Sequence, residues 1–300
     1  MLKYRDRRTF PDVESIKIET KVHTMIPTAK IFSLLVLFAL GPLANAQDPS
    51  EGGKSTDKVA VINIHLKPLT ANKSIIPLNK KGGLWIDITR KWVIVDGSVC
   101  LREGPLEMFM CPAQTKEHES VITTPIDAEA VHTSLLAIGA KTGRPVQFQP
   151  EYKRVTGSVI DIVVVWVGEN DKINASLAQD WIKKGNTRKT MQYAWVFGGS
   201  GYWKNPNTNE KIYYGNDGSL VCLSNFPTAT MDLPVESSNS NAARLYFANT
   251  SRIAPLKTPV RIIFSNRADV DATKIPRVLG DGGKLLESVR NWAVEIGTTD

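Results

Sequence analysis

Residues 84–101, with the sequence LWIDITRKWVIVDGSVCL, decide the fold class. Two runs rich in apolar and β-branched residues flank the polar pair Thr89-Arg90. This pattern is typical of two short strands joined by a turn. We therefore expect a β-hairpin here, and similar strand-like runs recur along most of the chain.

The other strand-like runs are short and separated by turn residues. They are VAVINIHL (59–66), LEMFMC (106–111), ESVITT (119–124), SVIDIVVVWV (158–167), KINASLAQ (172–179), MQYAWVF (191–197), KIYYG (211–215), SLVCLSNF (219–226), ARLYFAN (243–249) and PVRIIFSN (259–266). The turn GEND joins the fourth run to the fifth, and we expect a meander from 191 to 226 with its last turn at 216–218.

Two segments have helical patterns instead. In the first, Thr124 can cap the helix, Pro125 suits its first position, and Asp127 suits the positive end of the helix dipole. Val131, Leu135 and Ile138 share its apolar face, and Gly139 suits its end. The second follows Asp281, and its apolar face consists of Leu285, Leu286, Val289, Trp292, Ala293 and Ile296. A helix docked on the domain is favoured over an amphipathic membrane or partner helix, because its polar face is not notably cationic. We predict an α+β fold, with a predominantly antiparallel β-sheet or sandwich, one internal helix and a C-terminal helix.

An export signal is predicted near the amino terminus. Lys30 precedes an apolar segment, residues 31–43, which is followed by the small-residue motif Ala44-Asn45-Ala46. This segment is too short to span a bilayer, since a transmembrane helix needs about 20 apolar residues. We expect translation to start at Met25, cleavage to follow Ala46, and the mature chain to be periplasmic or extracellular with no transmembrane segment.

This signal sets the expected domain organisation. An upstream extension that is not translated (1–24) precedes the signal peptide (25–46), a flexible linker (47–58), the folded domain (59–265) and a C-terminal helical extension (266–300).

The charge of the chain does not indicate a nucleic-acid partner. The formal net charge is +7, but residues 1–46 hold seven Lys or Arg and only four Asp or Glu. The rest of the chain carries scattered charges with no basic stripe, which neutralising phosphates would require. We expect no nucleic-acid partner.

The three cysteines, Cys100, Cys111 and Cys222, allow at most one intramolecular disulfide. Cys111–Cys222 is the preferred pair, although all three thiols can also be buried apolar groups. With three histidines after the signal and no close ligand spacing, the sequence predicts no metal site and no cofactor.

Residues 111–121, CPAQTKEHESV, concentrate reactive side chains. If 106–111 and 119–124 pair antiparallel, Cys111 lies opposite either His118 or Glu119, depending on a one-residue register. The first register permits a thiolate–imidazolium pair with Lys116 nearby to lower the thiol pKa. The second makes the segment a polar loop. Cys111 and His118 are therefore the candidate catalytic residues.

Aromatic residues cluster between 193 and 214, beside the glycines of GGSG (198–201). That motif is not a nucleophile elbow, because Tyr202 stands where the final glycine belongs. Tyr202, Trp203 and Asn205 form the loop side of the cluster, where a sugar or a peptide could stack. The predicted binding residues are Lys116, His118, Glu119, Tyr202, Trp203 and Asn205, on a surface that combines the loops 112–118 and 199–210.

The chain also resembles a known family. The stretch LREGPLEMFMCPAQTKEHESVITTPIDAEAVHTSLLAIGAKTGRPVQF (101–148) and the later blocks AQDWI, WVFGGSGYW, LVCLSNFP and LPVESSNSN are similar to the YdjY domain family. The resemblance covers roughly residues 75–265. It implies an exported bacterial protein and brings no catalytic residue to this chain.

The leading expectation is a non-catalytic binding or interaction domain of the cell envelope, whose partner is a small molecule, a glycan or an envelope protein. A purely structural component of an envelope assembly is a less favoured version. The alternative is a thiol-dependent enzyme or redox protein that uses Cys111 and His118.

Overall fold

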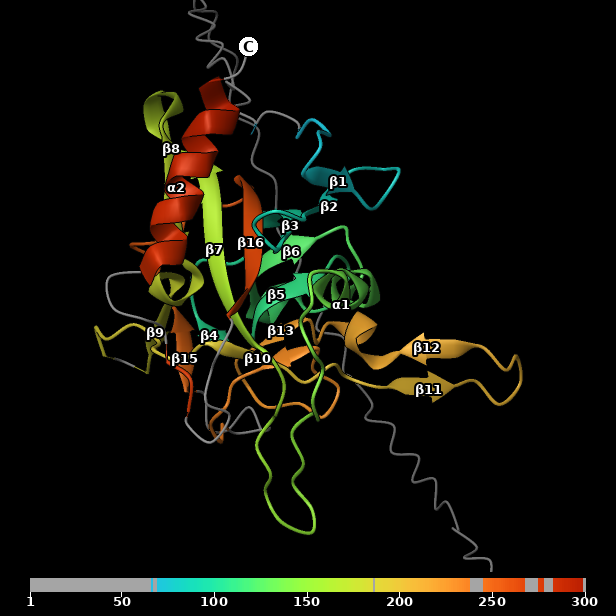
Figure 1. Cartoon of the computed structure of the whole chain (residues 1–300). Coiled ribbons are helices and arrows are strands. Elements are labelled where there is room, and N and C mark those ends of the chain that lie inside the picture. The colour runs from blue at the N-terminus through green and yellow to red at the C-terminus, as the bar shows by residue number, and fades with distance from the viewer. Residues whose placement is uncertain are drawn as a thin grey trace, which may run out of the picture. The chain divides into compact units, whose positions relative to one another are not determined.

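The computed structural model of the chain is shown in Figure 1. The residues described are 66, 69–185, 187–237, 245–267, 275–277 and 283–298. The predicted upstream extension, signal peptide and linker lie outside them, as do the strand predicted at 59–66, apart from Leu66, and the predicted cap Asp281.

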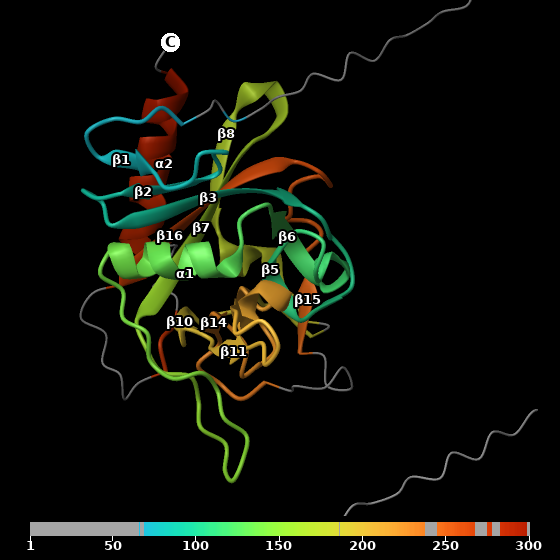
Figure 2. The ribbon, with the colours of Figure 1, turned by 90° about the vertical axis from the view of Figure 1, so that its right-hand side faces the viewer.

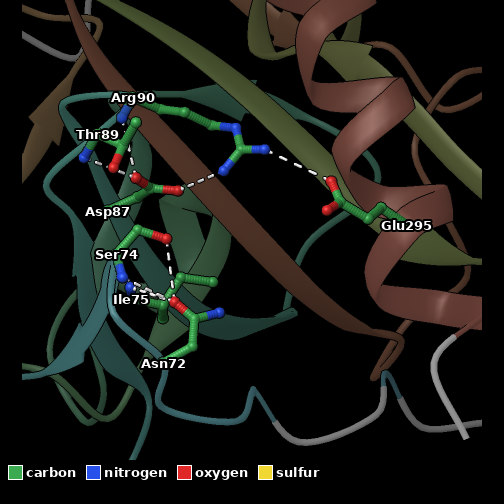
Figure 3. Close-up of polar contacts among 7 residues, drawn as sticks. All are labelled: Asn72, Ser74, Ile75, Asp87, Thr89, Arg90 and Glu295. Carbon is green, nitrogen blue, oxygen red and sulfur yellow. Dashed lines mark hydrogen bonds and ion pairs between the residues drawn. The ribbon is translucent and has the colours of Figure 1, made fainter.

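The hairpin predicted at 84–101 is confirmed. β2 (Leu84–Asp87) and β3 (Trp92–Val99) pair antiparallel, with Asp87 opposite Trp92. Figure 3 shows the turn: the buried Asp87 carboxylate accepts hydrogen bonds from the backbone N–H groups of Thr89 and Arg90, at 3.0 and 2.9 Å. β1 (Ile75–Pro77) pairs with the other edge of β2, and the Asn72 side chain accepts hydrogen bonds at its start.

The sheet is predominantly antiparallel, as predicted, but its main part closes on itself as an eight-stranded barrel rather than forming a sandwich. Around the barrel the order is β3, β16 (Pro259–Arg267), β7 (Val159–Val167), β10 (Trp195–Phe197), β14 (Met231–Asp232), β13 (Val221–Cys222), β5 (Met108–Pro112) and β6 (Ser120–Thr124). The last residues of β3, Ser98 and Val99, pair with Thr123 and Ile122 of β6 and complete the ring. Barrel and sandwich strands share the same alternating pattern, so the pattern alone does not distinguish them.

Two of the strand pairs are parallel, β5–β6 and β13–β14. The antiparallel pairing considered for 106–111 and 119–124 is therefore wrong. β6 runs antiparallel to β3, while β5 runs antiparallel to β13. These two pairings fix the directions of β5 and β6, and the link through the 3₁₀ turn η1 (Glu117–Glu119) carries the chain back to the start of the neighbouring strand.

Alternating side chains of the long strands fill the barrel. Val93, Val95, Ile162, Val164, Ile262 and Phe264 belong to this interior cluster, together with Trp195 and Phe197. The internal helix α1 (Ala128–Ala137) lies across the barrel (Figure 2) and adds Val131 and Leu135 to the same cluster. The predicted apolar face of this helix is thus confirmed.

The ends of α1 agree with the prediction in part. Asp127, rather than Thr124, is the N-cap, and its carboxylate accepts a hydrogen bond from Ala130 N at 2.6 Å. Thr124 instead ends β6 and donates its hydroxyl to Asp96 O. Gly139, with φ of 87°, follows the helix as predicted.

The C-terminal helix α2 (Gly283–Thr298) docks on the outside of the barrel, as predicted. Leu286, Val289, Trp292 and Ala293 are buried in a second apolar cluster, where Trp292 meets Trp92 edge to face at 5.7 Å. Arg90 links the first hairpin to this helix through Glu295, 3.4 Å away (Figure 3). Within the described part of the chain, none of the helices combines the length and apolarity that a membrane span requires.

The remaining strands lie outside the barrel. β8 (Ile173–Leu177) pairs with β7 after the 3₁₀ turn η2 (Glu169–Asp171), as predicted. β4 (Pro105–Leu106), β15 (Tyr246–Ala248) and β9 (Ile182–Lys184) form a small sheet beside η3 (Ala178–Trp181), and β11 (Tyr202–Lys204) pairs with β12 (Lys211–Tyr213). The predicted meander over 191–226 is wrong. β10 and β13 are barrel strands that do not pair with each other, and β12 pairs with β11 outside the barrel. The segment 214–217 is a 3₁₀ turn, η4 (Tyr214–Asp217), that ends at Gly218 with φ of 119°.

Candidate functional site

The predicted catalytic pair is not assembled. Cys111 lies opposite Thr123 in the parallel pair β5–β6, so neither predicted register occurs. The Cys111 side chain is fully buried, and burial raises the pKa of its thiol. His118 lies in η1 with 77% of its side chain exposed. A buried neutral thiol and an exposed imidazole weigh against nucleophilic chemistry.

All three thiols are free, so the preferred Cys111–Cys222 disulfide is not formed. Cys222 is buried on β13, and burial raises the pKa of its thiol well above the usual value. Burial also raises the pKa of Cys100 to about 12, although this side chain is only half-buried. The alternative that the cysteines act as small apolar groups fits Cys111 and Cys222.

Lys116 and Glu119 are engaged with the protein itself. The Lys116 ammonium lies 3.6 Å from the Glu119 carboxylate and 4.6 Å from the centre of the Phe226 ring. The aliphatic part of Lys116 packs over Gly218, where a Cβ atom would come within 2.6 Å of it. These contacts shape the 113–119 loop and leave its charges partly compensated.

The aromatic candidates lie on an arm that projects from the barrel, formed by β11 and β12 (Figure 1). Tyr202 is opposite Tyr213, Trp203 is opposite Ile212, and Lys204 is opposite Lys211. Tyr202 and Trp203 are 49% and 42% exposed. We call residues 202–213 the aromatic arm. Large exposed aromatic side chains on a projecting element are typical of contact surfaces.

A buried polar network fixes the base of the arm. The Tyr213 hydroxyl lies 2.8 Å from His132 Nδ1 of α1, 3.0 Å from Thr230 Oγ1 and 3.2 Å from Gly199 O. Burial raises the pKa of Tyr213 and lowers the pKa of His132, which keeps both groups neutral. The Tyr202 hydroxyl adds a bond to Glu129 at 3.1 Å. The sequence did not indicate that His132 and Tyr213 would meet.

Ser200, in the GGSG motif, has the left-handed φ of 52° that a strained nucleophile can also show. Its hydroxyl, however, donates to Thr228 O at 2.6 Å, while its backbone N–H donates to Ala229 O. A hydroxyl whose proton is held by a carbonyl oxygen has no general base. Ser200 therefore ties the arm to the barrel rather than forming a catalytic group.

The two predicted surface loops both contact the segment 214–230. Lys116 packs on Gly218, while Gly201 O accepts a hydrogen bond from Tyr214 N at 3.0 Å. Among the described residues, no hydrogen bond, ion pair or ring contact joins loop 112–118 directly to loop 199–210. Asn205 lies in the arm's tip, where its Oδ1 accepts from Asn207 N at 2.9 Å.

The sequence did not indicate one buried polar site, which is centred on the carboxyl group of Asp232. Asp232 on β14 is fully buried on the outer side of the barrel wall, and its carboxylate accepts from Asn225 Nδ2, Leu233 N and Phe226 N at 2.9, 2.7 and 3.2 Å. Burial raises the pKa of Asp232 to about 7. The available signal was a single Asp between apolar neighbours in TMDLP (230–234).

The described residues offer little for a metal ion or a small cofactor. No group of three or more His, Cys, Asp or Glu side chains converges among them. A shallow cleft of about 370 Å³ between β8 and α2 is lined by Lys172, Ile173, Asn174, Ala175, Arg290 and Val294. Its two cations stand on different elements, and Arg290 already bonds Ala175 O at 3.4 Å.

Fold and site together describe a closed β-barrel domain with a docked helix and a projecting aromatic arm. The YdjY domain model matches residues 84–265, more than half of the chain. The chain belongs to the YdjY domain family, which confirms the predicted resemblance. No curated protein and no solved structure matched the chain.

Proposed function

We propose that this YdjY domain protein is a non-catalytic binding domain of the bacterial cell envelope, reached by export through the predicted signal at residues 25–46. Its contact surface is the aromatic arm. The observation that carries the proposal is the exposure of Tyr202 and Trp203 on an arm whose base is fixed by the buried Tyr213.

A rigid base and exposed aromatic side chains on the arm favour recognition over chemistry. Fixing the arm in advance reduces the conformational entropy lost on binding, and exposed Trp and Tyr side chains supply contact area at low entropic cost. The thiol alternative has less support, because Cys111 is buried and its pKa is raised.

Co-sedimentation tests this function. The purified chain is mixed with isolated bacterial sacculi and, separately, with membrane vesicles, and the bound fraction is measured after centrifugation. We expect the unmodified chain to sediment with one of these fractions and Trp203→Ala to weaken that binding about tenfold, as for an interface hot spot.

Val294→Ala is the matched control, since Val294 is also an exposed apolar residue, 55% exposed on α2. Its binding should equal that of the unmodified chain. Equal sedimentation of Trp203→Ala and the unmodified chain would remove the arm as the contact surface.

A further inference from the structure

The aromatic arm has two different faces. Directly opposed residues of an antiparallel pair share a face, and successive residues alternate. One face, which we call the inner face, carries Tyr202, Tyr213, Lys204 and Lys211. The other, which we call the outer face, carries Trp203 and Ile212, and the bond from Asn205 N to Glu210 O at 2.8 Å extends it to Asn205 and Glu210.

Two residues of the inner face, Tyr202 and Tyr213, contact the rest of the domain. The rings of Tyr202 and Tyr213 meet edge to face at 5.2 Å, and their hydroxyl groups contact Glu129 and His132 of α1. The Trp203 indole lies on the opposite side of the ribbon and makes no ring contact with any described residue. Trp203 is 42% exposed, so its indole is accessible to a ligand on the outer face.

The edges of the arm are poor places for strand addition. Each strand has three residues, and each carries a lysine near the tip, at Lys204 and Lys211. Short edge strands that bear lysine are a common protection against pairing with a further strand. A peptide that adds a strand is thus disfavoured, which leaves recognition by side chains of the outer face.

The polar groups of the outer face suit hydroxyl groups. Asn205 Oδ1 already accepts from Asn207 N and Thr208 N, at 2.9 and 3.4 Å, which leaves its Nδ2 as a donor. The exposed Glu210 carboxylate forms no hydrogen bond or ion pair with the described part of the chain, so it remains an acceptor. An indole beside one donor and one acceptor, with both lysines on the other face, favours an uncharged polyhydroxy ligand over an anion.

We propose that the outer face binds a saccharide. One sugar ring lies over the Trp203 indole, and its hydroxyl groups bond to the Glu210 carboxylate and the Asn205 amide. The inference rests on the proposed function and narrows it, since it names the ligand class of the same arm.

Calorimetric titration of the full chain tests the ligand class. The probes are three tetrasaccharides, built from N-acetylglucosamine, β-1,4-linked glucose and α-1,4-linked glucose, with tetra-alanine as the peptide probe. We expect at least one tetrasaccharide to bind with a Kd between about 10 μM and 1 mM, which is the range of a weak single-module contact, and tetra-alanine not to bind.

Variants then locate the site. Trp203→Ala should weaken saccharide binding at least about tenfold, a change of about 1.4 kcal/mol, while Trp203→Phe should retain most of it. Glu210→Gln should weaken binding several-fold. Lys204→Gln and Lys211→Gln, on the inner face, are the matched controls and should bind like the unmodified chain. Unchanged thermal unfolding of each variant shows that the fold is intact.

The outcomes separate this inference from the proposed function. If no tetrasaccharide binds while Trp203→Ala still loses sedimentation with sacculi or vesicles, the saccharide assignment is wrong and the binding function stands. Binding of tetra-alanine in preference to all three sugars also overturns the assignment. Loss of saccharide binding in the lysine variants but not in Trp203→Ala would place the ligand on the inner face and contradict the proposal.

Discussion

At the scale of single residues, Asp232 is a carboxyl group enclosed by protein with N–H groups as its hydrogen-bond partners. Its pKa is about 7 in the folded chain, against about 3.9 in an unfolded one. Between these two values the folded state holds a proton that the unfolded state has released. The contribution of Asp232 to the free energy of unfolding is therefore fully present below about pH 4. It is lost as the pH rises to about 7 and does not change further above that pH.

Asp232→Asn should remove this part of the pH dependence. The neutral amide lacks the titrating proton, so the free energy of unfolding of the variant should decrease less between pH 4 and pH 7 than that of the unmodified chain. The difference between the two decreases should be on the order of 3 kcal/mol. Urea unfolding at several pH values measures it. Asp217→Asn, at an exposed position of η4, is the control and should leave the slope unchanged. Parallel pH profiles for Asp232→Asn and the unmodified chain would contradict the assignment.

The buried thiols give a second prediction at this scale. Because burial raises the pKa of both Cys111 and Cys222, we expect neither to react with iodoacetamide within minutes at pH 8 in the native chain. After unfolding in guanidinium chloride, all three cysteines should be modified. Intact mass spectrometry counts the adducts, and rapid modification of Cys111 in the native chain would revive the thiol-enzyme alternative.

At the scale of elements, the base of the aromatic arm depends on one hydroxyl. Tyr213→Phe removes the group that His132 and Thr230 contact and leaves their polar atoms buried with fewer partners. We expect a loss of about 1–3 kcal/mol in the free energy of unfolding, together with faster amide exchange in β11. Tyr214→Phe is the adjacent control, and an equal effect of both changes would show that the network does not hold the arm.

Local elements were largely predictable from the sequence, whereas pairings were not. The hairpin 84–101, the face of α1 and the face of α2 follow from periodicity, which is a local property. The direction of β6 is set by its pairing with β3, some 20 residues earlier in the chain, so the spacing between β5 and β6 suggested a hairpin that does not form.

Only the residues on the aromatic arm itself were predictable from the sequence, whereas the buried contacts at its base were not. Tyr202, Trp203 and Asn205 were recognised from composition, and the structure places all three on the arm. The buried contacts at its base join α1, β12 and the loop after β10, which are far apart in sequence. Asp232 was missed because a lone Asp carries no periodic signal.

At the scale of the whole molecule, barrel closure depends on close approach between β3 and β6. A Cβ atom at Gly97 would lie 2.6 Å from the backbone oxygen of Thr123, and backbone cannot move aside as a side chain can. Gly97→Ala should therefore cost about 1–3 kcal/mol of stability, as for overpacking, and should speed amide exchange in β6. Ser98→Ala, at the next position, is the control. Full stability of Gly97→Ala would mean that this junction is not tightly closed.

The position of β16 has a consequence for how the chain is made. This strand comes late in the sequence yet lies between β3 and β7, pairing with both along most of their length. Until residues 259–267 leave the ribosome, β3 and β7 have no strand to join them, and such long-range pairing is slow. Barrel closure therefore waits for a strand that is synthesised after the other strands of the barrel.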